Sequence, residues 1–169
     1  MANHFNISGE LTQQLIAAGD DIGVAKISLT NTQKVSKCKV DLYIEKKLTG
    51  KFHLLKGIEL PIGATLIYDD IKFKTITDEF SLYIKLTDGD TFTLTGSIDP
   101  TASTAITGVG TLFLNEVSAG DEIVVSSETR TVSAVTSNTS LTLTTATTDT
   151  SNDTTPDCNP TALVDIIIN

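Results

Sequence analysis

The sequence predicts an all-β protein, an antiparallel β-sandwich with an inserted small β-barrel, and three observations support this prediction. Apolar and polar residues alternate along most of the chain, so that Val40, Leu42 and Ile44 share one strand face. Turn residues such as Asp88 and Gly89 recur about every ten residues, as in sandwiches. Trp is absent and Phe and Tyr total only nine, so the core must consist mainly of Val, Ile and Leu, which favour strands.

The first half of the chain supplies the expected sandwich strands. They are residues 24–31, 38–47, 51–61, 64–70, 71–76, 80–87 and 90–96. The segment GELTQQLIAAGD (Gly9–Asp20) fits a helix, an extended arm or a first strand.

The second half of the chain has a different sequence pattern. Residues 99–110 are typical of a linker, and they precede four short expected strands at 111–117, 121–127, 129–136 and 140–146. Thr147–Pro160 is small, polar and punctuated by proline, which predicts a flexible connector.

The last segment, Thr161–Asn169, is too apolar to remain in water and needs a sheet to join. We expect it to enter the first domain, beside the strand at Phe80–Thr87. The predicted organisation is therefore a sandwich of residues 1–88 and 157–169, with residues 89–156 inserted as a small acidic β-barrel on flexible linkers. Two tandem domains with a swapped terminal strand are the alternative.

The formal charge of −9 lies entirely in the second half. Residues 1–88 hold 11 lysines and 11 acidic residues, whereas residues 89–169 hold 10 acidic residues and one base, Arg130. Such a region repels phosphate backbones, so we expect no nucleic-acid partner. A solvated surface and a cation-binding face are the two interpretations of the charge.

The N-terminus lacks the basic and apolar regions of a secretory signal, and no apolar run approaches the roughly 20 residues of a membrane span. We expect no membrane partner, and we expect the protein to be made and folded in a cytosol. Cys38 and Cys158 fit no metal-binding spacing, which favours two free thiols over a single bridge.

Residues that could carry chemistry are scarce. His4 and His53 are isolated, and no nucleophile, phosphate-loop or zinc-protease motif occurs. The acids near Asp88, Asp90 and Asp149 lack the ordered spacing of a calcium loop. We therefore expect no enzyme activity, no cofactor and no metal site.

Partner contacts are the remaining candidate sites. Tyr43 and Tyr83 fall opposite the aliphatic residues of their strands and are candidates to anchor a partner protein or stack on a sugar. A lysine-rich outer face that includes Lys39, Lys46 and Lys47 is interpreted either as edge protection or as a contact surface for acidic neighbours.

Two stretches resemble modules of tailed-bacteriophage virion proteins. The first resembles a sandwich module through Leu42-Tyr43, Leu55-Lys56-Gly57-Ile58, Pro61-Ile62-Gly63-Ala64-Thr65-Leu66 and Ser81-Leu82-Tyr83-Ile84. The second resembles a small β module through Gly108, Gly110, Thr111, Phe113, Gly120, Asp121, Ile123, Thr131, Val132, Ala134, Val135, Thr139, Ser140 and Leu141.

These resemblances imply a virion component, since such modules occur in neck, tail, fibre and capsid decoration proteins. We expect a non-enzymatic structural protein that docks on other virion proteins and forms a homo-oligomer in the particle. The alternative from another class is a receptor- or glycan-binding adhesin or fibre module.

Overall fold

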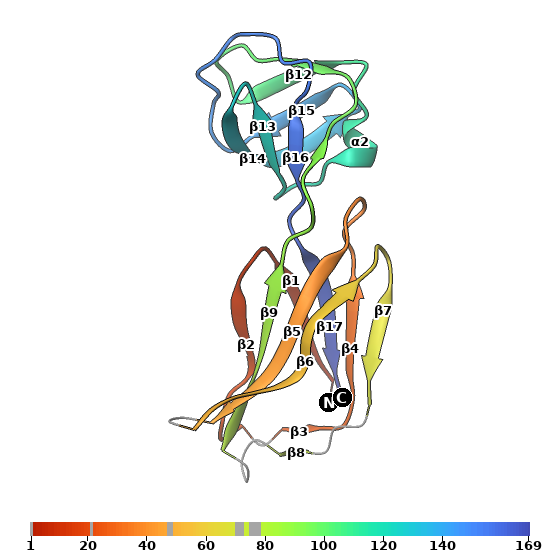
Figure 1. The fold of residues 1–169 in the computed structure, drawn as a ribbon, viewed down its shortest axis with the longest axis vertical. Helices are drawn as coiled ribbons and strands as arrows, with labels where there is room; N and C mark the ends of the chain where they lie inside the picture. Colours follow the sequence, from red (N-terminus) through yellow and green to blue (C-terminus); the bar gives the residue numbers. More distant parts are fainter. Residues whose placement is uncertain (1, 21, 47–48, 70–72, 75–78) are drawn as a thin grey trace. The chain divides into compact units, whose positions relative to one another are not determined.

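The computed structural model describes residues 2–20, 22–46, 49–69, 73–74 and 79–169 (Figure 1). The chain divides into two compact units. Unit 1 comprises Met1–Thr32, Lys37–Asp88 and Ala162–Asn169, and unit 2 comprises Gln33–Ser36 and Gly89–Thr161. Almost all regular structure is antiparallel strand, which confirms the predicted all-β class.

Unit 1 is a sandwich of two four-stranded antiparallel sheets, with strand orders β1-β17-β4-β7 and β2-β9-β5-β6 (Figure 1). The strands are β1 (Asn3–Ser8), β2 (Thr12–Ile16), β4 (Ile27–Asn31), β5 (Cys38–Lys46), β6 (Gly50–Leu60), β7 (Thr65–Tyr68), β9 (Phe80–Thr87) and β17 (Leu163–Ile168). The short strands β3 (Gly23–Val24) and β8 (Phe73–Lys74) form a separate ribbon. The segment Gly9–Asp20, which fits a helix, an extended arm or a first strand by its sequence, therefore contains a strand, β2.

The core of unit 1 follows from the alternation in its strands. Leu29, Val40, Leu42, Leu82 and Ile84 are fully buried between the sheets. Each is flanked in sequence by residues that point to the opposite face, as the period of a strand requires.

The C-terminal strand β17 lies in the interior of a sheet. Ile166 pairs with Phe5 of β1 on one side and Leu29 of β4 on the other. The expectation that it would lie beside Phe80–Thr87 is wrong, because β9 already has β2 and β5 as neighbours. A strand as apolar as β17 is stabilised most in a central position, and β1, which the sequence analysis missed, makes that position available.

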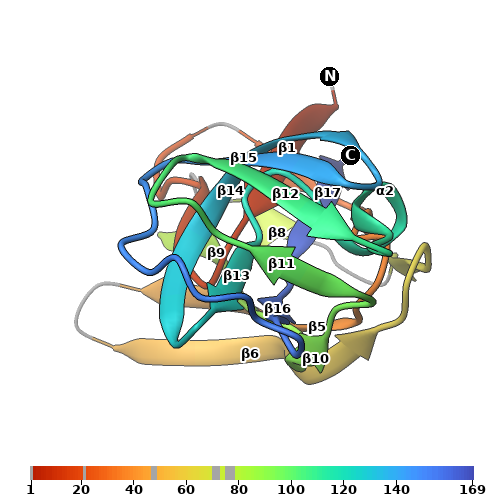
Figure 2. The ribbon, with the colours of Figure 1, turned by 90° about the horizontal axis from the view of Figure 1, so that it is seen from above.

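Unit 2 is a seven-stranded sheet of order β10-β16-β13-β14-β15-β12-β11, with one short helix (Figure 2). Its elements are β10 (Phe92–Thr93), β11 (Ser97–Asp99), β12 (Ala105–Val109), α2 (Phe113–Glu116), β13 (Glu122–Val125), β14 (Glu128–Ser137), β15 (Ser140–Leu143) and β16 (Asp157–Asn159). β10 and β11 are the end strands of this order, but Ile98 of β11 exchanges two backbone hydrogen bonds of 2.8 Å with Asp153, in the segment before β16. The described residues show no closed barrel, so the closure of the predicted barrel is not confirmed.

Two further expectations for unit 2 are wrong. Residues 99–110 are not only a linker, since Ala105–Val109 pairs with β15 and β11. Residues 111–117 are not a strand, because Phe113–Glu116 forms one helical turn that buries Phe113 completely.

The predicted connector Thr147–Pro160 packs onto unit 2. Thr147, Pro156 and Cys158 are buried, and Asp157–Asn159 pairs with β10 and β13. Residues 157–161 therefore belong to unit 2, although the predicted boundary placed them in the sandwich. The buried residues of this segment are single small or apolar residues among polar ones. The sequence therefore has no periodic pattern there that would predict this packing.

Gly108 and Gly110, from the stretch that resembles a small β module of phage proteins, have structural roles. A Cβ atom on Gly108 would overlap the side chain of Thr111 and lie 3.0 Å from Cζ of Phe113. Gly110 has a φ of +67°, a conformation that side chains other than glycine adopt at a cost. Both positions serve the turn that leads to α2, and neither presents a reactive group.

The central position of β17 leads to a prediction about two adjacent isoleucines. We expect Ile166→Ala to destabilise unit 1 by about 2–5 kcal/mol, because Ile166 is 1% exposed and its removal leaves a cavity. The matched control is Ile167→Ala, on the opposite face and 39% exposed, which we expect to cost less than about 1 kcal/mol. Chemical denaturation followed by circular dichroism measures both, and equal losses would contradict the assigned faces.

Candidate interaction site on the outer face of unit 1

A row of side chains crosses the outer face of the sheet β2-β9-β5-β6. Gln14, Tyr83, Tyr43 and His53 are direct cross-strand partners in successive strands. Opposite residues of antiparallel strands share a face, so these four side chains lie side by side. Two of the predicted contact residues, Tyr43 and Tyr83, are thus brought together.

The aromatic rings of this row contact one another. Tyr43 and Tyr83 are stacked, with ring centroids 5.4 Å apart and planes inclined by 13°. His53 lies on the other side of Tyr43, also at 5.4 Å but tilted by 47°. Such ring pairs contribute about 0.5–1.5 kcal/mol beyond burial, so the row stabilises the register of three strands.

Tyr43 is covered by its neighbours, with only 3% of its surface exposed. The Lys51 ammonium lies 4.6 Å from its ring centroid and donates a hydrogen bond of 3.3 Å to its hydroxyl. This hydrogen bond raises the pKa of Lys51 above its ordinary value. A partner at this face would meet Lys51, His53 and the half-buried Tyr83 before Tyr43.

The positive charges of the lysine-rich outer face are largely compensated by carboxylates. Lys46 forms an ion pair of 2.8 Å with Glu79, and Lys56 forms one of 2.6 Å with Asp41. Lys39 is exposed and lies opposite Glu59. Lys47 lies outside the described residues. The outer face is therefore mixed in charge.

A shallow depression of about 420 Å³ adjoins the aromatic row. It is lined by Gln14, Ala17, Ala18, Glu45, Glu79, Ser81 and Tyr83. The hydroxyl of Ser81 accepts a hydrogen bond of 3.0 Å from the Ala18 N–H, which fixes one wall. Two carboxylates, an amide and an aromatic ring together offer hydrogen-bond acceptors and a stacking surface.

The edge strand β6 is irregular where it passes Asp41. Lys56 and Gly57 both lie opposite this one residue, which is a β-bulge, and Gly57 has a φ of +60°. The Asp41 carboxylate accepts hydrogen bonds of 2.6 Å from the Gly57 N–H and the Lys56 ammonium. Partial burial works to raise the pKa of Asp41, but these donors hold it below its ordinary value.

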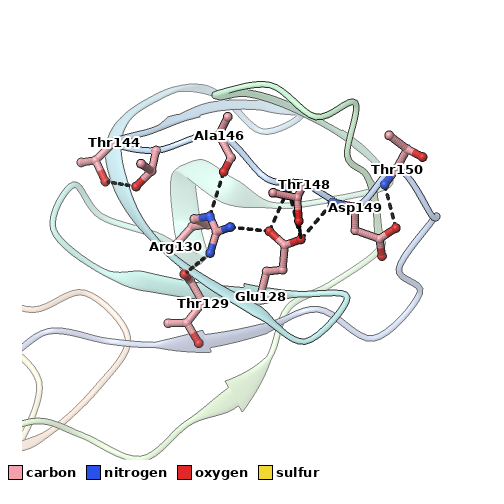
Figure 3. A network of polar contacts seen from close by, with 9 residues as sticks. Glu128, Thr129, Arg130, Thr144, Ala146, Thr148, Asp149 and Thr150 are labelled. Atoms are coloured by element: carbon pink, nitrogen blue, oxygen red, sulfur yellow. Dashed lines mark hydrogen bonds and ion pairs between the residues drawn. The ribbon is translucent and has the colours of Figure 1, made fainter.

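Unit 2 contains a polar network centred on Glu128 (Figure 3). Its carboxylate accepts hydrogen bonds from the backbone N–H groups of Thr148 and Asp149 and from the Thr148 hydroxyl. Arg130 donates to the same carboxylate at 2.5 Å and to the carbonyl oxygens of Ala146 and Thr129 at 2.9 Å. Arg130, the one base among residues 89–169, thus ties the segment after β15 to the strand β14.

The two cysteines are free and buried, as expected. Burial, with a smaller effect of Asp88, raises the pKa of Cys38 to about 11. Burial, with smaller effects of Asp121 and Glu116, raises the pKa of Cys158 to about 12. Both thiols therefore stay protonated at neutral pH.

The described part of the chain holds neither a metal-binding cluster nor a membrane-spanning helix. No group of three or more His, Cys, Asp or Glu side chains there could hold a metal ion. None of the helices described is long and apolar enough to span a bilayer.

Comparisons with known proteins add little. No protein-family model matches the chain, and no curated protein matches it. The solved structure of infectious bursal disease virus, Gx strain, is similar with a TM-score of 0.28 and 10% identity. The similarity covers 99% of this chain but only 41% of the viral chain. A TM-score this low does not indicate a shared fold, so the similarity assigns no function.

Several residues of this surface escaped the sequence analysis. Gln14 lies far from Tyr83 in the sequence, and only the pairing of β2 with β9 brings it to the row. Glu79 precedes β9 and lines the adjoining depression, which no sequence pattern indicates. Phe52 and Ile58 are 50% and 37% exposed at the edge of the sheet. Their exposure comes from their edge position, which no local pattern signals.

The Glu128 network leads to a pH-dependent prediction. Its hydrogen bonds, chiefly those of Thr148, lower the pKa of Glu128 below its ordinary value. A lowered folded-state pKa means that the stabilisation is present above the unfolded pKa and is lost as the pH falls through the folded pKa. We therefore expect Glu128→Gln to melt below the parent protein at neutral pH, with the difference in melting temperature narrowing as the pH falls through the lowered pKa of Glu128.

Thermal unfolding across this pH range measures the effect, and Glu122→Gln is the control. Glu122 is exposed on the neighbouring strand β13. A difference between Glu128→Gln and the parent that stays constant with pH would contradict the role of the Glu128 charge.

Proposed function

We propose that the chain is a non-enzymatic structural protein of a tailed-bacteriophage particle, which docks on the neck, tail or capsid through unit 1 and displays unit 2. One observation carries this proposal. The strand β6 is an eleven-residue edge strand, and eight of its residues are exposed. A long edge strand offers unpaired backbone groups to which a neighbouring subunit can add a strand.

The packing of the resembling motifs also supports a structural role. Gly108 and Gly110 serve a turn, and Phe113 is fully buried. The Asp121 carboxylate accepts hydrogen bonds from the Ser118 N–H at 2.8 Å and the Thr161 N–H at 2.9 Å. Residues whose groups are used in packing leave no chemistry for a reaction, which favours docking by area burial.

The partners in this proposal are other virion proteins and further copies of the chain. A position at the neck or tail is favoured slightly over capsid decoration. Virion parts are commonly symmetric oligomers, so weak contacts of one copy become strong when many copies dock together.

A cryo-electron map of the purified source particle tests the proposal. We expect density for unit 1 against other virion proteins, in a fixed copy number set by the symmetry of the docking site. Mass spectrometry of the same particles is the independent measurement. Absence of the chain from particles purified to constant composition would falsify the structural role.

A glycan-binding adhesin is the second candidate, and the depression beside Tyr83 favours it. The carboxylates of Glu45 and Glu79 and the amide of Gln14 could accept hydrogen bonds from sugar hydroxyls, while Tyr83 offers a stacking surface. Tyr43 takes no direct part because it is covered.

A host-surface glycan array tests this candidate with the full chain. We expect Tyr83→Ala to weaken specific retention, with a loss of about fivefold to 150-fold in affinity, since stacking on an aromatic side chain contributes about 1–3 kcal/mol. Tyr68→Ala on the strand β7 is the control and should retain binding. No retention of the parent chain on any glycan would eliminate the adhesin role.

A further inference from the structure

The free edge of β6 carries apolar and charged residues in a symmetric order. The edge strands of the two four-stranded sheets of unit 1 are β1, β2, β7 and β6, and β6 is the longest of these four, with 11 residues against at most 6. Phe52 and Ile58, which are 50% and 37% exposed, lie three residues before and after Leu55. Lys51 and Glu59 lie four residues before and after it and carry opposite charges.

We infer that β6 pairs antiparallel with the β6 of a second copy, around a twofold axis at Leu55. This inference builds on the proposed function, because it names the partner of the edge through which unit 1 docks. In this register Lys51 lies opposite the second copy's Glu59, and Phe52 lies opposite the second copy's Ile58. Each pair occurs twice by symmetry.

The faces of β6 agree with this register. Lys51 and Glu59 pair with Glu45 and Lys39 of β5, on the outer face of the sheet. Phe52 and Ile58 pair with Ile44 and Val40, which face the core. Opposite residues of an antiparallel ladder share a face, so charged residues meet on the outer side and apolar residues on the core side.

The irregularities of β6 are compatible with the same pairing. The register of β6 against β5 shifts between Leu55 and His53 and again between Ile58 and Leu55. These two shifts lie on either side of Leu55, so each would face the other across the twofold axis. The two β6 strands then have the same number of residues between one matched pair and the next.

Neighbouring registers are less favourable. A shift of two residues in one direction puts Lys56 opposite the second copy's Lys56, a like-charge pair. The proposed register itself places Lys56 opposite the second copy's Leu54, whereas a shift of two residues in the other direction places Phe52 opposite Lys56 and also separates Lys51 from Glu59. Opposite charges across a ladder stabilise and like charges destabilise, so the proposed register is selected by its side chains.

Charge reversal of the full chain tests the pairing in solution. A single pair of edge strands is a small interface, so we expect a dimer with a Kd on the order of 10 µM. Lys51→Glu and Glu59→Lys each create two like-charge pairs, and each should raise the Kd about tenfold. The double variant restores both pairs with reversed signs and should recover most of the affinity.

Sedimentation velocity over a concentration series measures these constants, and Lys26→Glu is the matched control. Lys26 is exposed outside β6, so its reversal should leave the Kd unchanged. A chain that stays monomeric at about 300 µM, or single reversals that match the double variant, would overturn the inference.

A mixed disulfide provides an independent measurement of the register. Side chains directly opposite each other have Cβ atoms about 4.5–5.5 Å apart. Mixing Lys51→Cys with Glu59→Cys under mild oxidation should give a heterodimer faster than either variant forms a homodimer. The native Cys38 and Cys158 are buried and should not react. Equal rates for all combinations would overturn the register.

The outcome is separate from that of the proposed function. If particles carry the chain but the chain is monomeric in solution and gives no cross-link, the virion role is supported and the dimer is refuted. A dimer with the predicted charge dependence from a chain absent from particles would do the reverse.

Discussion

The pairing of the C-terminal strand between β1 and β4 is the constraint on which unit 1 depends. Val164, Ile166 and Ile168 are each 1% exposed, so this strand contributes a full row of the core. The chain cannot complete the sandwich until it has passed through unit 2 and returned. The two ends of the insertion are also tied together, because the Asp88 carboxylate accepts a hydrogen bond of 2.6 Å from the Ala162 N–H.

This tie explains how an inserted unit is accommodated. Asp88 is the last residue of unit 1 before unit 2, and Ala162 is the first after it. Fixing exit and return at one point makes the length of the insertion nearly irrelevant to the sandwich. Partial burial raises the pKa of Asp88, despite the opposing effect of the Ala162 hydrogen bond. The carboxylate therefore bears a desolvation cost that its position at the junction imposes.

Sequence patterns predicted the parts of the fold that depend on local alternation. The strands at 38–46, 80–87 and 140–143 were recognisable because their buried residues fall at every second position. The strand Asn3–Ser8 was missed because Ile7 alone is buried in it. The partner of the C-terminal strand could not be predicted, since pairing between distant strands depends on the whole sandwich.

The candidate site was predictable only in its aromatic residues. Alternation placed Tyr43 and Tyr83 on the outer face, and the register of β5 with β9 makes them direct partners. The cover that Lys51 forms over Tyr43 depends on the register of β6 with β5, which the pattern of neither strand alone encodes. The positive charge of the lysine-rich face is smaller than the lysines alone suggest. The carboxylates of Asp41, Glu59 and Glu79 form ion pairs with lysines of this face.

The acidity of the second half has a structural use. Unit 2 includes long irregular segments whose backbone N–H groups lack ladder partners, and such groups need acceptors when they are not solvated. Carboxylates supply them: Asp149 accepts from the Thr150 and Ser151 N–H groups, and Asp153 accepts from the Ser126 and Thr155 N–H groups. A short side-chain carboxylate suits this task because it accepts several hydrogen bonds at once. The carboxylates of Asp149 and Asp153 are therefore engaged in holding loops of unit 2.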